Sequence, residues 1–275
     1  MLDSRIVDVV RRALDEDLGS GDVTSRACIP ETTQARGVFL AREELVLAGT
    51  AVLPVVYELA GDGARLEILR QDGDRVGDGD VIARVEGNAR RLLECERVAL
   101  NFLQRLSGVA TLARRFADAV EGTGCRVLDT RKTTPGLRLL EKMAARSGGA
   151  VNHRMGLYDA ILIKNNHIAA AGGVDQALQA AQSSGLPIEI EVRTQKELEE
   201  ALRCGATHLL LDNLTPDEAR RQIAWIAGRA KVELSGGITL DTVRAFAETG
   251  ADFVSAGAIT HSARAMDLSF RLELL

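Results

Sequence analysis

Apolar runs of strand length alternate with helical patterns through the second half of the chain, and this alternation constrains the fold most strongly. The helical patterns cover residues 194–204, 215–228 and 239–250. Strands that alternate with helices of about 10–15 residues indicate βαβ units and a parallel sheet. A full barrel has about eight strands, so we expect an incomplete α/β barrel. Its strands are predicted at residues 126–129, 160–164, 187–192, 208–212, 231–235 and 252–256.

Four of the apolar runs finish in a polar residue, namely Lys164, Glu191, Asp212 and Ser235. One such ending is ordinary, because strand ends are often solvated. Four successive endings favour a site, since the carboxyl ends of parallel strands meet on the face of a barrel that carries the chemistry. Glu189 and Glu191 share one strand face; we prefer Glu191, which is nearer the strand end.

Five cationic residues fall between Asp129 and His167, near the loop ends of predicted strands. Burial of an unpaired charge costs several kcal/mol in effective terms, so such residues are poor core material. They are good receptors for carboxylates and phosphates. The chain as a whole is acidic, with a formal net charge of -5, which favours a focused site for a small anion over a nucleic-acid surface. The five are Arg131, Lys132, His153, Arg154 and Lys164.

Two glycine-containing turns follow the last two predicted strands: SGGI at residues 235–238 and SAGAI at residues 255–259. Each turn alone is ordinary. At successive late strands of a barrel, such turns are typical of a phosphate site built from backbone N–H groups. Glycine there lets the backbone approach the anion closely.

The first 90 residues follow a different pattern. An amphipathic helix is predicted at the start, with Leu2, Ile6, Val9, Val10 and Leu14 on one face. Short β-like runs then span residues 35–49 and 63–87. The second run resembles the hairpins of barrel-sandwich carrier domains, but residues 36–90 contain no lysine that could be modified. A structural β module is therefore the better interpretation.

Residues 91–122 predict one long helix or two abutting helices, with an interruption at Gly108. The four cysteines, Cys28, Cys95, Cys125 and Cys204, are far apart and form no CxxC motif. We therefore expect reduced thiols in a cytoplasmic protein without a structural zinc site. No apolar run approaches the ~20 residues of a membrane span, so no membrane association is expected.

Several long motifs follow one another along the chain: EDLGSGDVTS at residues 16–25, ERVALNFLQRLSGVAT at 96–111, DTRKTTPGLRLLEK at 129–142, GGAVNHRMGLYDAILIKNNH at 148–167, IEIEV, LLLDN, SGGIT and SAGAIT. These motifs and their order resemble those of the quinolinate phosphoribosyltransferase family. The resemblance covers essentially the whole chain. It implies an N-terminal α/β-sandwich domain at residues 1–107 and an incomplete α/β barrel at residues 108–264. The tail at residues 265–275 would pack back on the first domain.

The resemblance also implies an enzyme of NAD biosynthesis, a pentosyltransferase. It would join quinolinate to phosphoribosyl pyrophosphate, with magnesium, and release pyrophosphate and carbon dioxide to give nicotinate mononucleotide. The implied assembly is a homodimer whose active sites take residues from both subunits. The sequence leaves a dimer and a hexamer of stacked dimers open.

Site roles follow from the same resemblance. Quinolinate would be held by Arg131, His153, Arg154 and, from the neighbouring subunit, Arg97. Lys132 and Lys164 would meet quinolinate or pyrophosphate oxygens, and Thr130 would contact substrate. Glu191 and Asp212 would lie near the ribose hydroxyls and the magnesium, so the implied catalytic residues are Lys132, Lys164, Glu191 and Asp212. The 5'-phosphate would be held by Ser235, Gly236, Gly237, Ala256 and Gly257.

One departure from the family pattern is Arg193, which stands where an acidic or neutral residue is common. The role of His167 is undecided. Three rival functions remain open: a relative with another acceptor, a barrel lyase with Lys164 as a Schiff-base lysine, and a nucleotide-binding module without activity. The retained cations argue against the first. Borohydride trapping on Lys164 tests the second, and ligand binding without turnover would indicate the third.

Overall fold

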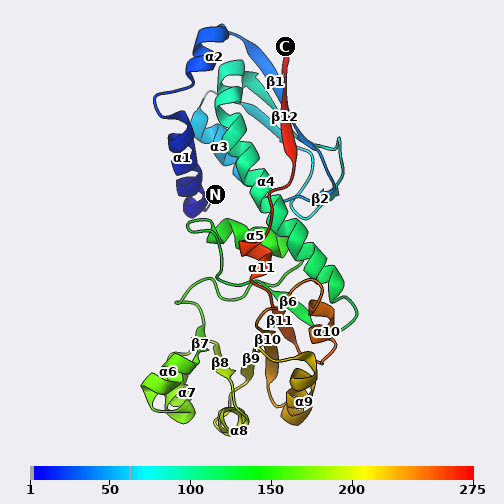
Figure 1. The fold of residues 1–275 in the computed structure, drawn as a ribbon. Coiled ribbons are helices and arrows are strands. Elements are labelled where there is room, and N and C mark those ends of the chain that lie inside the picture. Colours follow the sequence, from blue (N-terminus) through cyan, green and yellow to red (C-terminus); the bar gives the residue numbers. More distant parts are fainter. Residues whose placement is uncertain (1–2, 62) are drawn as a thin grey trace. The chain divides into compact units, whose positions relative to one another are not determined.

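The protein consists of two compact units, and neither unit is continuous in sequence. The structure is a computed structural model that describes residues 3–61 and 63–275 (Figure 1). The first unit comprises Met1–Arg114, Thr133–Gly149 and Ser262–Leu275, and the second comprises Arg115–Lys132 and Ala150–His261. The family resemblance implies a first domain at residues 1–107 with the tail at 265–275, whereas residues 133–149 also group with the first unit.

A four-stranded antiparallel sheet is the centre of the first unit. Its order is β12 (Leu268–Leu274), β1 (Gln34–Ala41), β5 (Val81–Asn88) and β3 (Arg65–Ile68). Burial alternates along β1, as expected for a strand with one face on a core. Phe39 of β1 stands opposite Phe270 of β12 in edge-to-face contact, with ring centroids 4.9 Å apart. The C-terminal tail is thereby a strand of this sheet. A separate pair is formed by β2 (Leu45–Val46) and β4 (Arg75–Val76).

The first unit also contains the helices α1 (Ser4–Leu18), α2 (Val23–Cys28) and α3 (Val52–Ala60). The predicted first helix is α1, which begins where the Asp3 carboxylate accepts from the Arg5 amide. Its buried residues are Ile6, Val10 and Leu14, whereas Leu2 lies outside the described residues. The sequence analysis did not predict α3.

The predicted alternative of one long helix is confirmed by α4 (Ala89–Ala119), and the predicted interruption at Gly108 is wrong. Glycine is required there for close packing, not for a break. A Cβ atom built on Gly108 would lie 1.8 Å from the carbonyl oxygen of Arg264. The C-terminal segment therefore passes directly against the helix backbone at this residue.

A buried ion pair fastens residues 133–149 within the first unit. Arg105 of α4 donates to Oε1 of Glu141, with Nη2 at 2.7 Å and Nε at 3.0 Å. Glu141 lies on α5 (Arg138–Ser147) and is fully buried. Its other oxygen accepts from the amide of Thr134. This pairing explains why α5 groups with the first unit although its neighbours in sequence do not.

The predicted parallel sheet forms the second unit, with all six strands in place (Figure 1). Its order is β6 (Arg126–Leu128), β11 (Phe253–Ser255), β10 (Lys231–Ser235), β9 (His208–Asp212), β8 (Ile188–Val192) and β7 (Ile161–Ile163). Adjacent strands pair in parallel. On the outer edge of β6, Val151 makes an isolated bridge to Leu128. The sheet is thus an incomplete barrel.

Two helices of the second unit start at threonine caps. Thr194 caps α8 (Gln195–Arg203) and Thr215 caps α9 (Pro216–Ile226), each with a glutamate at the third helical position. Each cap is the first residue of a helical pattern predicted from the sequence, at residues 194–204 and 215–228. The remaining helices are α6 (Asn165–Ala171), α7 (Val174–Gln182), α10 (Val243–Ala247) and α11 (Ala258–His261). Within residues 3–61 and 63–275, no helix is both long enough and apolar enough to cross a bilayer.

Candidate active site

A cavity of about 460 Å³ opens among the carboxyl ends of the strands in the second unit. Its polar wall combines cations from the β6 and β7 ends with carboxylates from β8, β9 and β10. The sequence-predicted residues that it brings together are Thr130, Arg131, Lys132, His153, Arg154, Lys164, Glu191, Asp212 and Ser235. Leu162, Leu210, Glu233 and Ser255 complete the lining.

Asp129, which sequence reasoning did not single out, fixes the loop that carries His153. It is fully buried at the end of β6. Its carboxylate accepts from Asn152 Nδ2 at 2.6 Å and from the His153 amide at 2.9 Å. A buried carboxylate is stable when such donors satisfy its oxygens. The sequence signal that could have identified Asp129 is its position as a polar residue directly after the apolar run of β6.

The guanidinium groups of Arg131 and Arg154 make one side of the cavity strongly cationic. Burial and repulsion from Arg131 lower the pKa of Arg154 below its ordinary value. Arg154 is held at two points, because its amide donates to His153 Nδ1 and its Nη1 donates to the carbonyl of Ala160 at 3.1 Å. Two such groups side by side suit a ligand with more than one negative charge.

Glu191 holds two cations at the end of β8. Its carboxylate is 5 % exposed; Arg193 reaches Oε1 with Nη2 at 3.0 Å and Nε at 3.2 Å, and Lys164 Nζ lies 3.7 Å from Oε2. Lys164 and Arg193 are each about half exposed. The buried carboxylate is therefore fixed while its partners remain free to move toward a ligand.

Asp212, at the end of β9, is bound to its neighbours on the same edge. Ser235 Oγ donates to Oδ1 at 2.8 Å, and Asn213 Nδ2 donates to Oδ2 at 2.6 Å. Gly236 directly follows Ser235 in the chain and has a positive φ of 99°. A Cβ atom there would lie 2.4 Å from Asn213 Oδ1, so only glycine fits this turn.

The second glycine turn adjoins Lys132. A Cβ atom on Gly257 would lie 2.8 Å from Lys132 Cδ, and Thr260 Oγ1 donates to the Lys132 carbonyl at 2.7 Å. The amide of Lys132 donates to Thr130 Oγ1. The amide of Ala256 donates to the carbonyl of Leu128, so it is already engaged within the sheet. This contact counts against Ala256 as a phosphate-binding amide and leaves Gly236, Gly237 and Gly257.

Glu189 and Glu233 both face His153. Sequence reasoning preferred Glu191 to Glu189 and did not single out Glu233, because alternation along a strand gives its face but not its partners.

Some predicted or undecided residues lie outside the cavity lining, namely Arg97, His167, Gly236, Gly237, Ala256 and Gly257. Arg97 is exposed on α4, in the first unit. His167 caps α6, since its Nδ1 accepts from the Lys164 amide at 2.9 Å. That contact gives His167 a structural role beside Lys164.

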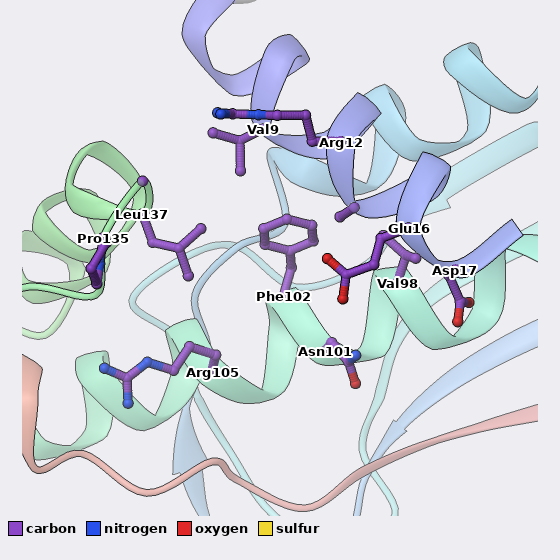
Figure 2. Close-up of a pocket in the computed structure, with 12 residues that line it drawn as sticks. Val9, Arg12, Glu16, Asp17, Val98, Asn101, Phe102, Arg105, Pro135 and Leu137 are labelled. Atoms are coloured by element: carbon purple, nitrogen blue, oxygen red, sulfur yellow. The ribbon is translucent and has the colours of Figure 1, made fainter. Parts of the chain in front are cut away.

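A second cavity, of about 500 Å³, lies in the first unit between α1, α4 and residues 135–137. Figure 2 shows Phe102 at its centre, between Glu16 of α1 and Leu137. Its charged residues carry both signs: Arg12 and Arg105 against Glu16 and Asp17. None of its lining residues belongs to the predicted substrate site.

The second unit is thus an incomplete parallel α/β barrel whose cavity is lined by both cations and carboxylates. Family models for quinolinate phosphoribosyl transferase match nearly the whole chain. The N-terminal domain model matches residues 22–107 and the C-terminal domain model matches residues 109–271. The chain belongs to the quinolinate phosphoribosyl transferase family.

Similar proteins agree with this assignment. A Bacillus subtilis protein named probable nicotinate-nucleotide pyrophosphorylase [carboxylating] is 42 % identical over 94 % of this chain and 90 % of its own length. The chloroplastic Arabidopsis thaliana enzyme of that name is 40 % identical over 96 % of this chain and 82 % of its own. The crystal structure of NadC from Streptococcus pyogenes matches with a TM-score of 0.95 and 40 % identity, covering 100 % of this chain and 99 % of that one.

Proposed function

We propose that this enzyme transfers the phosphoribosyl group of phosphoribosyl pyrophosphate to quinolinate with decarboxylation. The products are nicotinate mononucleotide, pyrophosphate and carbon dioxide, in de novo NAD biosynthesis. Family membership and the relatives' names support this reaction. The observation that carries the proposal is the set of cations and carboxylates that lines one cavity of the second unit.

Quinolinate is a dicarboxylate, and the cationic side of the cavity suits it. Arg131 and Arg154 supply two guanidinium groups, which bind carboxylates through paired N–H donors. Lys132 and Lys164 add two mobile charges for the pyrophosphate or for quinolinate. The 5'-phosphate would lie at Ser235, Gly236, Gly237 and Gly257, where the glycines leave the backbone open to a close anion.

The carboxylates suit the transfer step. Displacement at the anomeric carbon develops positive charge on the ribose, and Glu191 and Asp212 would stabilise it. The ring nitrogen of quinolinate attacks that carbon, so the protein need not supply a nucleophile. The bond to the pyrophosphate oxygen breaks with its electron pair, and Lys132 and Lys164 would stabilise the departing charge. When the adjacent carboxylate leaves as carbon dioxide, its electron pair stays on the ring carbon next to the positively charged nitrogen, which stabilises it. A proton from water then bonds to that carbon and gives nicotinate mononucleotide. Orientation and charge placement are then the main work of the protein.

Magnesium fits the same carboxylates. Glu191 and Asp212 offer hard oxygen ligands, and magnesium is commonly held by one or two carboxylates together with substrate phosphates. When bound, it would neutralise charge on the pyrophosphate.

A homodimer with shared active sites completes the proposal. Arg97 is exposed on α4 and absent from the cavity lining, which is consistent with its use in a neighbouring subunit. A cytoplasmic location is proposed from the four cysteines, all of which are free thiols.

The Schiff-base alternative is less well supported. A lysine that forms a Schiff base is usually deprotonated by burial or by a neighbouring cation. Lys164 is instead half exposed, and its Nζ lies 3.7 Å from a carboxylate oxygen of Glu191, so it has neither of these features.

Assays of the purified protein test the proposed function. We expect loss of quinolinate and formation of nicotinate mononucleotide only when quinolinate, phosphoribosyl pyrophosphate and magnesium are all present. Turnover with nicotinate but not with quinolinate would move the protein to a relative with another acceptor. Borohydride inactivation with a carbonyl substrate would support the lyase alternative.

A further inference from the structure

Three side chains from separate elements meet on the inner side of the second unit. His153 Nε2 lies 3.0 Å from Oε2 of Glu189 on β8 and 3.4 Å from Oε2 of Glu233 on β10. The exposed fractions of the three side chains are 17 %, 14 % and 4 %. The substrate-binding roles above use neither glutamate.

The other ring nitrogen of His153 is also engaged. Nδ1 accepts the amide N–H of Arg154 at 2.7 Å. A ring nitrogen that accepts a hydrogen bond carries no proton. The proton of the neutral ring is therefore on Nε2, directed at the two glutamates, and both nitrogens of His153 bind protein groups.

This tautomer weighs against a metal ion in the cluster. The three ligand atoms lie within 4.8 Å of one another, which is close enough for a shared ion. A metal on Nε2 would need the lone pair of that nitrogen and would move the proton to Nδ1. A proton on Nδ1 would oppose the N–H of Arg154, so the observed contact favours a hydrogen-bonded cluster.

The geometry of the cluster decides where the ring proton lies. Nε2 is within reach of both carboxylates, and the Arg154 amide donates to Nδ1. Although burial opposes ionisation, the hydrogen bonds to Glu189 and Glu233 raise the pKa of His153. The contact with the Arg154 amide opposes a second ring proton, because Nδ1 accepts this bond only without one.

We propose that His153, held by Glu189 and Glu233, is a positioning residue that orients Arg154 and does not itself bind the carboxylates of quinolinate. The inference rests on the proposed function and refines the role that the family resemblance implies for His153. Arg154 is fixed at its amide by His153 and at its guanidinium by the carbonyl of Ala160. Such fixation places the guanidinium before the ligand arrives, which lowers the entropic cost of binding.

Two substitutions separate positioning from direct contact. The side-chain oxygen of His153→Asn can still accept the Arg154 amide, whereas His153→Leu offers no acceptor. We expect His153→Leu to raise the quinolinate KM about tenfold more than His153→Asn does, since one hydrogen bond is lost. The KM for phosphoribosyl pyrophosphate should change equally in both. Equal losses of quinolinate affinity in the two variants would overturn the proposal.

Nitrogen-15 spectra of the His153 ring in the wild-type enzyme give an independent answer, even if His153→Leu does not fold. We expect a protonated Nε2 and an unprotonated Nδ1, unchanged when quinolinate is added. A ring protonated on both nitrogens, or one whose signals move on quinolinate binding, would overturn the proposal. The protonation of Nδ1 and Nε2 can be measured in the protein without substrate. Turnover of quinolinate by the wild-type enzyme tests the proposed function separately.

Discussion

The guanidinium of Arg193 lies against Glu191, with Nη2 3.0 Å from Oε1 of the buried carboxylate. Arg193 follows the end of β8 at a position where the family resemblance leads one to expect an acidic or neutral residue. In this chain a cation therefore competes with any metal or ribose group that approaches Glu191.

Arg193→Gln should lower the half-saturating magnesium concentration, because it removes that competing charge. The Arg193 side chain is half exposed, so its ion pair with Glu191 contributes at most about 1 kcal/mol. The half-saturating magnesium concentration should therefore fall by up to about fivefold. The measurement is the initial rate against magnesium concentration, with Lys196→Gln on the exposed face of α8 as the control. A higher magnesium requirement would mean that Arg193 assists substrate binding instead.

Arg131→Ala should raise the quinolinate KM about tenfold or more, as expected for loss of a charge-assisted contact to a carboxylate. The KM for phosphoribosyl pyrophosphate should change much less. Steady-state kinetics in both substrates measure the difference, and Arg203→Ala on the surface of α8 is the control. Unchanged quinolinate affinity would remove Arg131 from the binding role.

Glu191→Gln keeps the shape of the side chain and removes its charge. If Glu191 stabilises positive charge on the ribose, kcat should fall about a hundredfold, with smaller changes in KM. The matched control is Glu199→Gln, an exposed position on α8. A nearly normal kcat would exclude Glu191 from the transfer step.

Arg97→Ala and Lys132→Ala test the shared site by complementation. Each variant alone should be weak. A hybrid dimer would contain one site with both residues intact, so an equal mixture should recover about a quarter of wild-type activity after random subunit exchange. Activity of mixed and unmixed proteins is compared after exchange is verified by mass spectrometry. No recovery would indicate that Arg97 acts within its own subunit or not at all.

Gly108→Ala should destabilise the first unit, because the added Cβ would meet the carbonyl oxygen of Arg264 at 1.8 Å. Overpacking of this kind costs about 1–3 kcal/mol, which lowers the melting temperature by several degrees in a chain of this size. Gly77→Ala is the control, since no atom outside its chain neighbours lies within 4 Å of its Cβ position. Equal melting temperatures would show that the C-terminal segment can move away from α4.

The sequence by itself determined the fold class and the edge of the sheet that carries the site. Strand and helix periods are local properties, and all six parallel strands stand where the alternation places them. The carboxyl ends of parallel strands share one edge, so Lys164, Glu191, Asp212 and Ser235 had to lie on the same side of the sheet. The threonines that cap α8 and α9 can also be identified from the sequence, because the hydrogen bonds of an N-cap join residues only a few positions apart.

Tertiary structure alone decided which of these side chains are partners. Gly108 lets the carbonyl of Arg264, more than a hundred residues away in sequence, pack against α4, so no local rule could give the role of this glycine. Asp129, Glu189 and Glu233 show the same limit: each lies on a predicted strand or at its end, but its contact with the loop at residues 152–153 is long-range. Burial leaves a polar group no alternative to a protein partner, and the folded chain determines which partner is within reach.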